Sequence, residues 1–324
     1  MPAEVNSMFS VREKPWHGLG IVLDDYPGRI EAMKFAGHDF QIDEKDVFMK
    51  SGKSGTSTLK VDGWKALVKS TDGGVMTVVR DSYAVVQNDV MWDIVDAIVK
   101  EPNVKYETAG VLKNGAVLWV LARIEEPTVV KGDDTPIIPY VLVSTSHDQS
   151  APCKAQAVSV RVVCWNTYSM AQEQARGTGR EYVFRHTKNV MQKIEDARGA
   201  LAMTRDQYHE FLDMVIELGN HKITDKGVKQ FVSRFIPEPP KDLMTDRIRT
   251  NIAIERVKFY DLLEGRSVPD QHRHTSYGLF CAGIEFLDHI RAYRTPETYF
   301  RRTMLDTNSM VKKKVAKLAV EVAV

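Results

Sequence analysis

The sequence predicts an α+β protein, in which a mainly antiparallel sheet with few helices in the N-terminal half is followed by an all-helical C-terminal half. From about residue 38 to residue 163, β-branched and aromatic runs are separated by Gly, Asn, Asp and Pro, which is the pattern of strands. After Trp165 the apolar residues recur at the three-to-four spacing of helices. A chain of 324 residues, 43% of them hydrophobic, is long enough for two domains.

The N-terminal half is expected to contain two parts. Residues 1–27 hold too many Gly and Pro residues for a regular element, so we expect an ordered N-terminal arm. Residues 28–186 are expected to form the α+β sheet domain. Its helices are predicted at 29–37, ending at Gly37, and at 89–101, with Asp89 as N-cap. Its strands are predicted at 40–49, 75–80, 83–87, 106–113, 116–124, 137–146 and 157–164.

Residues 187–324 are expected to form a helical domain, and the change of architecture near residue 187 has no linker-like composition. The run of prolines at 237–240 cannot lie inside a helix. Helices are predicted at 166–175, 187–218, 224–235, 243–264, 274–293 and roughly 300–323.

Charge is distributed unevenly along a chain whose net charge is only +1. Residues 151–324 carry 28 Lys and Arg against 21 Asp and Glu, which gives +7, whereas residues 1–150 carry 16 against 22, which gives −6. A polyanionic partner is therefore expected to meet the C-terminal half. Three cysteines indicate reduced thiols, and neither a membrane span nor a signal peptide is evident, so we expect a cytoplasmic protein.

The stretch 176–188 interleaves basic and aromatic residues. Basic side chains neutralise phosphates and aromatic rings stack on unpaired bases, so this composition predicts binding of single-stranded nucleic acid. An ordinary connector that packs its aromatics on the sheet is an equally good interpretation. The residues predicted to contact phosphates are Arg161, Arg176, Arg180, Arg185 and Lys188, and those predicted to stack on bases are Tyr182 and Phe184.

A second hypothesis places an activated thiol at Cys164. In a Cys-dependent transferase or hydrolase, His147 would accept the thiol proton, and Asp148 or Asn166 would orient the imidazole. The alternative is a buried thiol at a strand end, with His147 and Asp148 capping a turn. No composed catalytic site is evident, so an enzyme is the less favoured class.

Cofactor and metal sites are not predicted. His272, His274, His289 and Cys281 have irregular spacing for metal ligands. The Gly-Lys-Ser string at 52–54 lacks the upstream glycine of a phosphate-binding loop and falls in a turn between strands.

Several strings occur in an order that resembles the phage/plasmid-like proteins of the domain-of-unknown-function 932 family. They are Pro15-Trp16-His17-Gly18-Leu19-Gly20, Tyr83-Ala84-Val85-Val86-Gln87-Asn88, Ser146-His147-Asp148, Arg161-Val162-Val163-Cys164-Trp165-Asn166-Thr167, His274-Thr275-Ser276-Tyr277-Gly278-Leu279 and Asp288-His289. The family usually has glycine after the His-Asp pair, where this chain has Gln149.

The resemblance implies a protein of phages, prophages or plasmids that acts in the bacterial cytoplasm, where DNA metabolism is a common role. Together with the basic segment, this leads to the hypothesis of a single-stranded DNA-binding protein that assists recombination, by strand annealing, or replication. The partner is then single-stranded DNA or another nucleic acid, and association into a homo-oligomer is left open. A third hypothesis is an antirestriction or anti-defence protein that binds a host factor.

Overall fold

The structure is a computed structural model. It describes residues 5–12, 20–51, 57–99, 104–124, 126–129, 131–133, 136–161, 166–169, 182–184, 186–187, 189–190, 192, 200–265, 268–290 and 309–323.

The protein has the predicted α+β architecture, with most of its helices in the C-terminal half. The chain forms two compact units, each made of several chain segments. The first unit comprises residues 1–124, 141–156 and 176–204, and the second comprises 125–140, 157–175 and 205–324. Strands β9 (Pro136–Ser146) and β10 (Cys153–Arg161) each have residues in both units.

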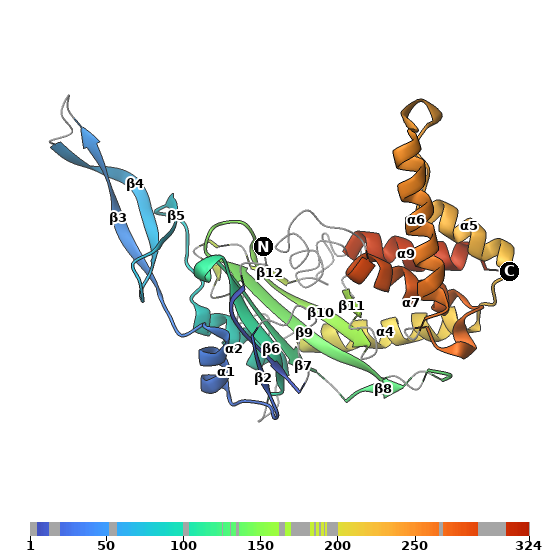
Figure 1. Ribbon diagram of the computed structural model, residues 1–324. Coiled ribbons are helices and arrows are strands. Elements are labelled where there is room, and N and C mark those ends of the chain that lie inside the picture. The colour runs from blue at the N-terminus through green and yellow to red at the C-terminus, as the bar shows by residue number, and fades with distance from the viewer. Residues whose placement is uncertain are drawn as a thin grey trace. The chain divides into compact units, whose positions relative to one another are not determined.

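A nine-stranded sheet has the main-path order β11-β10-β9-β7-β6-β1-β2, with β12 paired to β10 and β8 paired to β9 (Figure 1). The pairs β1–β6, β6–β7, β8–β9, β10–β11 and β10–β12 are antiparallel, whereas β1 and β2 are parallel. Its strands are β1 (Val5–Val11), β2 (Ile21–Leu23), β6 (Tyr106–Leu112), β7 (Val117–Arg123), β8 (Thr128–Val129), β9 (Pro136–Ser146), β10 (Cys153–Arg161), β11 (Asn166–Ser169) and β12 (Tyr182–Phe184).

Three local predictions are wrong. Residues 1–27 are not an arm without regular elements, because β1 lies inside the large sheet between β6 and β2, with Met8 and Phe9 buried. Residues 83–87 form no strand, and 166–169 are strand β11 instead of helix. Sheet pairing overrides local propensity in these segments, because a strand depends on partners that are remote in sequence.

A second sheet contains three antiparallel strands in the order β3-β4-β5 (Figure 1). They are β3 (Ile42–Ser51), β4 (Ser57–Lys69) and β5 (Val75–Arg80). Ser51 pairs with Ser57, so β3 and β4 are joined as a hairpin. Where β4 pairs with β5, Leu67 and Val79 are buried in the same core as the large sheet.

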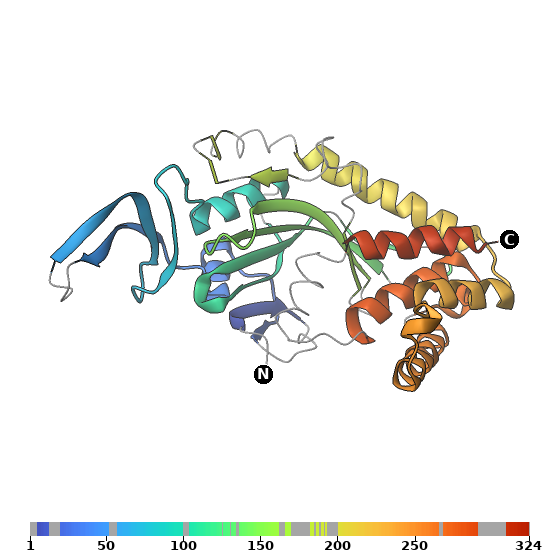
Figure 2. The ribbon, with the colours of Figure 1, turned by 90° about the horizontal axis from the view of Figure 1, so that it is seen from above.

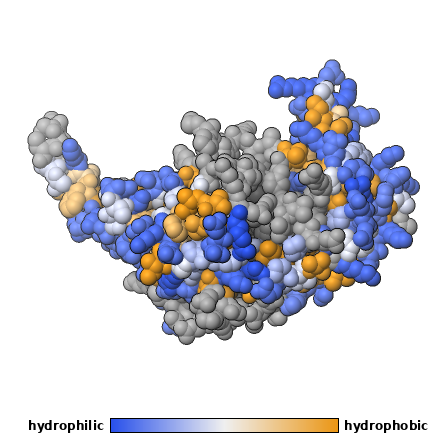
Figure 3. Space-filling model, turned by 60° about the horizontal axis from the view of Figure 1, so that its bottom comes forward, coloured by the Kyte–Doolittle hydropathy of each residue, from blue (hydrophilic) through white to orange (hydrophobic). Residues whose placement is uncertain are grey.

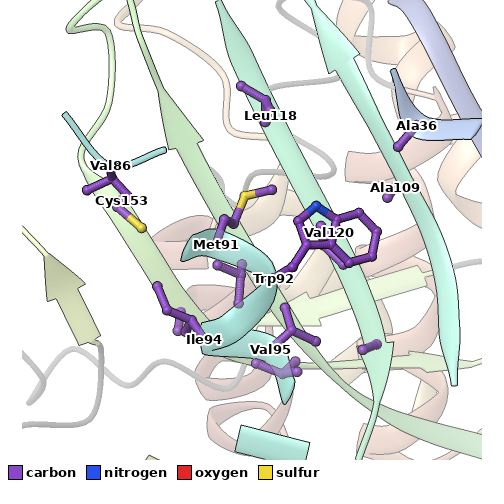
Figure 4. Packing of buried hydrophobic residues seen from close by; sticks show 14 of the residues in the cluster. Ala36, Val86, Met91, Trp92, Ile94, Val95, Ala109, Leu118, Val120 and Cys153 are labelled. Atoms are coloured by element: carbon purple, nitrogen blue, oxygen red, sulfur yellow. The ribbon is translucent and has the colours of Figure 1, made fainter. Parts of the chain in front are cut away.

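Two helices cover the core of the first unit. Helix α1 (Arg29–Ala36) ends at Gly37, whose φ of 72° is the left-handed conformation that glycine adopts at low cost. Helix α2 (Asn88–Val99) begins one residue before the predicted N-cap Asp89, which instead lies in its first turn. Figure 4 shows the apolar face of α2, including Trp92 and Val95, against β7 residues such as Val120.

The second unit is built from helices whose starts are marked by threonines. The hydroxyl groups of Thr224, Thr245 and Thr275 each accept a hydrogen bond from the backbone N–H of the third residue of the helix that follows. Helices α7 and α9 lie side by side (Figure 2). The helices are α4 (Ala200–Asn220), α5 (Asp225–Phe235), α6 (Asp246–Leu263), α7 (Ser276–Glu285), a π-helical turn (Phe286–Ile290) and α9 (Ser309–Glu321), and short 3₁₀ turns occupy Lys113–Gly115, Lys241–Leu243 and Asp270–His272.

The core of the helical unit contains a group of packed aromatic rings. The rings of Phe231, Phe235 and Phe259 all contact one another, at centroid distances of 5.5 to 5.6 Å, and Phe286 contacts both Phe235 and Phe259. Offset and edge contacts of this kind stabilise a core beyond simple burial. Within the part of the chain that the structure describes, no helix has the length and apolar character needed to cross a membrane.

A buried amide joins three segments of the first unit. The Asn88 side-chain nitrogen donates to the carbonyl oxygens of His38 and Phe40, at 3.0 and 2.8 Å. Its oxygen accepts from Nε2 of His147 at 2.8 Å. The His38 ring donates from Nε2 to the Gly110 carbonyl and accepts at Nδ1 from the Trp92 indole. All of these side chains are buried. His38 donates from one ring nitrogen and accepts at the other, and His147 donates from Nε2, as a neutral imidazole can.

Both histidines have lowered pKa values because burial disfavours the charged imidazole. Desolvation lowers the pKa of His38 to about 4 and that of His147 to about 3. The neighbouring His186 and His38 add like-charge repulsion at His147. The network is therefore built for two neutral histidines.

Replacing Gly278 by Ala should lower the thermal unfolding midpoint. A Cβ atom at this position would lie 2.1 Å from the carbonyl oxygen of His272, which is held by hydrogen bonds from the backbone and hydroxyl of Thr275. Overpacking of this kind costs about 1–3 kcal/mol. Gly28→Ala is the control, because the nearest atom that its Cβ would meet is a Glu31 oxygen at 3.9 Å. Equal midpoints for the two variants would contradict the predicted clash.

The free energy of unfolding should fall as the pH is lowered from 7 to 5. Below pH 6.5 the unfolded chain binds protons at His38 and His147, whereas the folded chain does not until about pH 4 and 3. Each histidine therefore removes about 2 kcal/mol at pH 5. In His147→Gln, which keeps an N–H donor for Asn88, the fall measured by urea unfolding should be about 2 kcal/mol smaller. An identical fall in both proteins would show that His147 does not titrate as proposed.

Candidate functional site

A surface pocket of about 400 Å³ lies in the first unit, a volume typical of small-ligand sites. The end of β5 and the segment after it line one side, and the turn after β9 and the segment after β12 line the other. We call it the Tyr83–His186 pocket. Its lining residues are Arg80, Ser82, Tyr83, Gln149, His186 and Thr187.

Two stacked rings form the centre of the pocket. The rings of Tyr83 and His186 lie 4.7 Å apart between centroids, with planes 9° from parallel. The backbone N–H of Ala84 donates to the His186 carbonyl at 3.2 Å, and Nδ1 of His186 donates to the Ala84 carbonyl at 3.1 Å. Because a carbonyl only accepts, the proton of the neutral ring is on Nδ1, and Nε2 presents a lone pair.

Each of these rings has a polar atom without a partner. The Tyr83 hydroxyl and Nε2 of His186 are buried, and neither has a hydrogen-bond partner among the described residues. Buried polar atoms are nearly always hydrogen-bonded in folded proteins, so unpartnered ones beside a pocket indicate a place where a ligand completes the bonding. Burial lowers the pKa of His186, which keeps Nε2 an acceptor at neutral pH. Burial also raises the pKa of Tyr83, which keeps its hydroxyl protonated.

Charges of both signs surround the pocket. The guanidinium of Arg80 lies over the Trp64 ring, 4.1 Å from its centroid, which holds an otherwise flexible side chain at the rim. Asp148 raises the pKa of Tyr83 through its charge and lies 3.9 Å from the Lys113 ammonium group. The rim is therefore cationic at Arg80 but not uniformly positive.

The turn that carries Gln149 keeps a glycine-like conformation. Gln149 has φ of 62°, in the left-handed region that a non-glycine residue adopts only at a cost. Its side-chain amide donates to the Thr77 hydroxyl at 3.0 Å and to the Val78 carbonyl at 3.4 Å. Gln149 thus connects this turn to β5.

The structure places only some of the predicted nucleic-acid-binding residues. Arg161 is paired with Asn166 and Tyr182 with Ala155 in the large sheet, but their side chains are outside the description. Phe184 contradicts the base-stacking prediction, because it is 2% exposed and packs in the core of the first unit. The apolar face of the sheet recruits this ring in preference to solvent. Arg176, Arg180, Arg185 and Lys188 lie outside the described residues.

The thiol hypothesis receives no geometric support. His147 is 1% exposed and uses its Nε2 proton on Asn88, while Asp148 accepts from the backbone N–H of Ser150. These are roles in a folded network and a turn. Cys164 lies outside the described residues, and Asn166 is described only as a strand residue. No group of three or more metal-ligating side chains gathers in the described part of the chain.

Sequence reasoning missed Arg80, Ser82 and Tyr83 as parts of a site. The sequence predicts a strand at 83–87, which begins at Tyr83. Local sequence patterns do not show which residues pack against each other across the fold, so the stacking of Tyr83 on His186 is not predicted from them. A signal was nevertheless present. Two strings that lie far apart in the chain are adjacent to the pocket: Tyr83 is a lining residue, and Gln149, another lining residue, directly follows His147-Asp148.

Comparison with known proteins identifies the family. No curated protein and no solved structure matches the chain. The sequence model of one family, described as "Domain of unknown function (DUF932)", matches residues 75–310, which include all of the residues that line the pocket. That match covers well over half of the 324 residues. The chain therefore belongs to the DUF932 family.

Proposed function

We propose that this protein binds single-stranded nucleic acid and that one unpaired base or nucleotide enters the Tyr83–His186 pocket. The observation that carries the proposal is the pair of buried, unpartnered polar atoms, the Tyr83 hydroxyl and Nε2 of His186, beside a pocket of about 400 Å³. Single-stranded nucleic acid offers the required chemistry, because unstacked bases present both hydrogen-bond donors and acceptors.

A base fits the interior of the pocket better than a phosphate does. A phosphate oxygen only accepts hydrogen bonds, whereas neutral His186 also needs a donor for Nε2. The charge of Asp148 near Tyr83 further disfavours an anion. Exocyclic amino and ring N–H groups of bases supply such a donor, and ring nitrogens or carbonyls accept from the Tyr83 hydroxyl.

Phosphates would instead be held at the rim and beyond it. Arg80 is exposed there and is already oriented by Trp64. In the sequence, Arg185 and Lys188 flank the pocket residues His186 and Thr187, which extends the cationic character along the chain. The proposal therefore keeps the basic segment as a source of phosphate contacts and replaces Phe184 with the pocket as the base-binding element. A role in phage or plasmid recombination or replication is part of this proposal.

Two other classes remain hypotheses. The Cys164-dependent enzyme would need a base other than the His147 described here, because that ring is buried and hydrogen-bonded. The burial of Cys153 raises the pKa of its thiol to about 12, so this residue is an unreactive reference for alkylation of Cys164. An antirestriction or anti-defence role has no specific observation in its favour.

Binding of a fluorescent oligonucleotide should weaken as salt rises. Each phosphate contact contributes about −0.7 to the slope of log K against log salt, so Arg80→Ala should flatten the slope by about 0.7. Arg249→Ala is the control, because Arg249 is an exposed arginine of α6 in the other unit. Fluorescence anisotropy measures both slopes. Absence of binding at low salt would end the proposal, and a change of slope in the control alone would move the site elsewhere.

Tyr83→Phe should weaken oligonucleotide binding without lowering stability. The variant keeps the ring that stacks on His186 and removes only an unpartnered hydroxyl, so the thermal midpoint should stay or rise. Loss of one hydrogen bond to a base lowers affinity about three- to tenfold. Tyr260→Phe, which removes the hydroxyl of a 38% exposed tyrosine on α6, should leave affinity unchanged. A destabilised Tyr83→Phe protein with normal affinity would identify the hydroxyl as structural.

A further inference from the structure

The end of the β3–β4 hairpin that lies near Ser51 and Ser57 extends beyond the part of the sheet that is paired with β5. Strand β5 pairs with β4 only from Trp64 to Val68, whereas β3 and β4 continue as a two-stranded ribbon as far as Ser51 and Ser57. We call its described residues, 48–51 and 57–60, the hairpin tip. Among the described residues, neither edge of this ribbon pairs with a further strand.

The hairpin tip exposes large apolar side chains in pairs. Met49 is opposite Leu59 and Phe48 is opposite Lys60, and the three apolar residues are between 53% and 58% exposed. Figure 3 shows hydrophobic side chains at the surface of this part of the molecule, next to hydrophilic ones. Natural sheets usually place charged residues at such free edges, so exposed Phe and Met at this position point to a partner.

The charge of the tip selects the class of partner. The described residues of the tip include two lysines, Lys50 and Lys60, and no Asp or Glu. Lys50 is exposed, and Lys60 extends beside Phe48 while its ammonium group contacts Asp46 at 2.8 Å. Because Lys60 is already ion-paired with Asp46, Lys50 is the lysine of the tip that we assign to a phosphate, beside an exposed phenylalanine that can stack on a base.

We propose that the hairpin tip is a second contact for the same nucleic-acid strand, in which an unpaired base stacks on Phe48 and Lys50 contacts a phosphate. The inference takes its ligand, single-stranded nucleic acid, from the proposed function, whereas its evidence comes from the hairpin tip and not from the pocket. Leu59 and Trp64 are five residues apart on β4, which is roughly 17 Å of strand. A nucleic acid that contacts both the pocket rim, at Trp64 and Arg80, and the hairpin tip must therefore be several nucleotides long. A dinucleotide is too short to reach both.

The experiment compares a 20-nucleotide single strand with a dinucleotide on the full chain. Phe48→Ala should weaken binding of the 20-mer about tenfold or more, because stacking on an aromatic ring contributes strongly for each base. It should leave dinucleotide binding and the thermal midpoint unchanged, since Phe48 is 58% exposed. Lys50→Ala should flatten the salt slope by about 0.7. Val75→Ala is the control, because Val75 is 65% exposed on β5 of the same sheet.

The outcomes separate the two proposals. If Tyr83→Phe weakens both ligands and Phe48→Ala weakens neither, the pocket stands and the tip is not a contact. If Phe48→Ala weakens the 20-mer and Tyr83→Phe does not, the tip stands and the pocket proposal fails. Loss of binding to phosphatidylserine vesicles in Phe48→Ala, with unchanged 20-mer affinity, would overturn the inference in favour of a membrane surface. A dimer that dissociates in Phe48→Ala, again with unchanged 20-mer affinity, would overturn it in favour of a second copy of the chain.

Discussion

The hydrogen-bonded amide of Asn88 is the interaction on which the first unit depends. It lies at the start of α2 and binds the backbone between α1 and β3 on one side and His147 after β9 on the other. Gln87 adds a second connection, because its side-chain amide exchanges two hydrogen bonds with the backbone of Ile42 at the start of β3. Buried polar groups of this kind are costly when one partner is missing, so the network specifies a single arrangement of these segments.

The Tyr83–His186 pocket is a consequence of that arrangement. Two short segments connect the pocket to the network. The first runs from Tyr83 in the pocket to Asn88 in the network, and the second runs from His147 in the network to Gln149 in the pocket. His147 is held neutral, and its pKa is lowered in part by the charge that His186 would carry. The two histidines therefore have different roles. His147 uses its ring to connect segments of the fold, whereas Nε2 of His186 has no hydrogen-bond partner among the described residues.

The aromatic residues show how burial distinguishes structure from recognition. Phe184 and Phe48 are both phenylalanines on β-strands next to basic residues, yet Phe184 is 2% exposed and Phe48 is 58% exposed. Phe184 lies opposite Cys153 in the large sheet, where a core is available to accept it. Phe48 lies on the part of the hairpin where, among the described strands, only β3 and β4 are paired. The same side chain is thus a core residue in one place and an available stacking surface in the other.

The amino-acid sequence alone predicts the α+β class, four of the nine strands of the large sheet (β6, β7, β9 and β10), helices α1 and α2 to within about two residues, and the family, because these depend on short periodic patterns and ordered strings. Only the tertiary structure decided that Val5–Val11 is an interior strand, that 166–169 joins the sheet and that Phe184 is buried. It also decided that Arg80, Tyr83 and His186 share one pocket. Strand pairing and pocket formation bring together residues separated by as many as about a hundred positions, and the register that joins them depends on contacts that local composition does not encode.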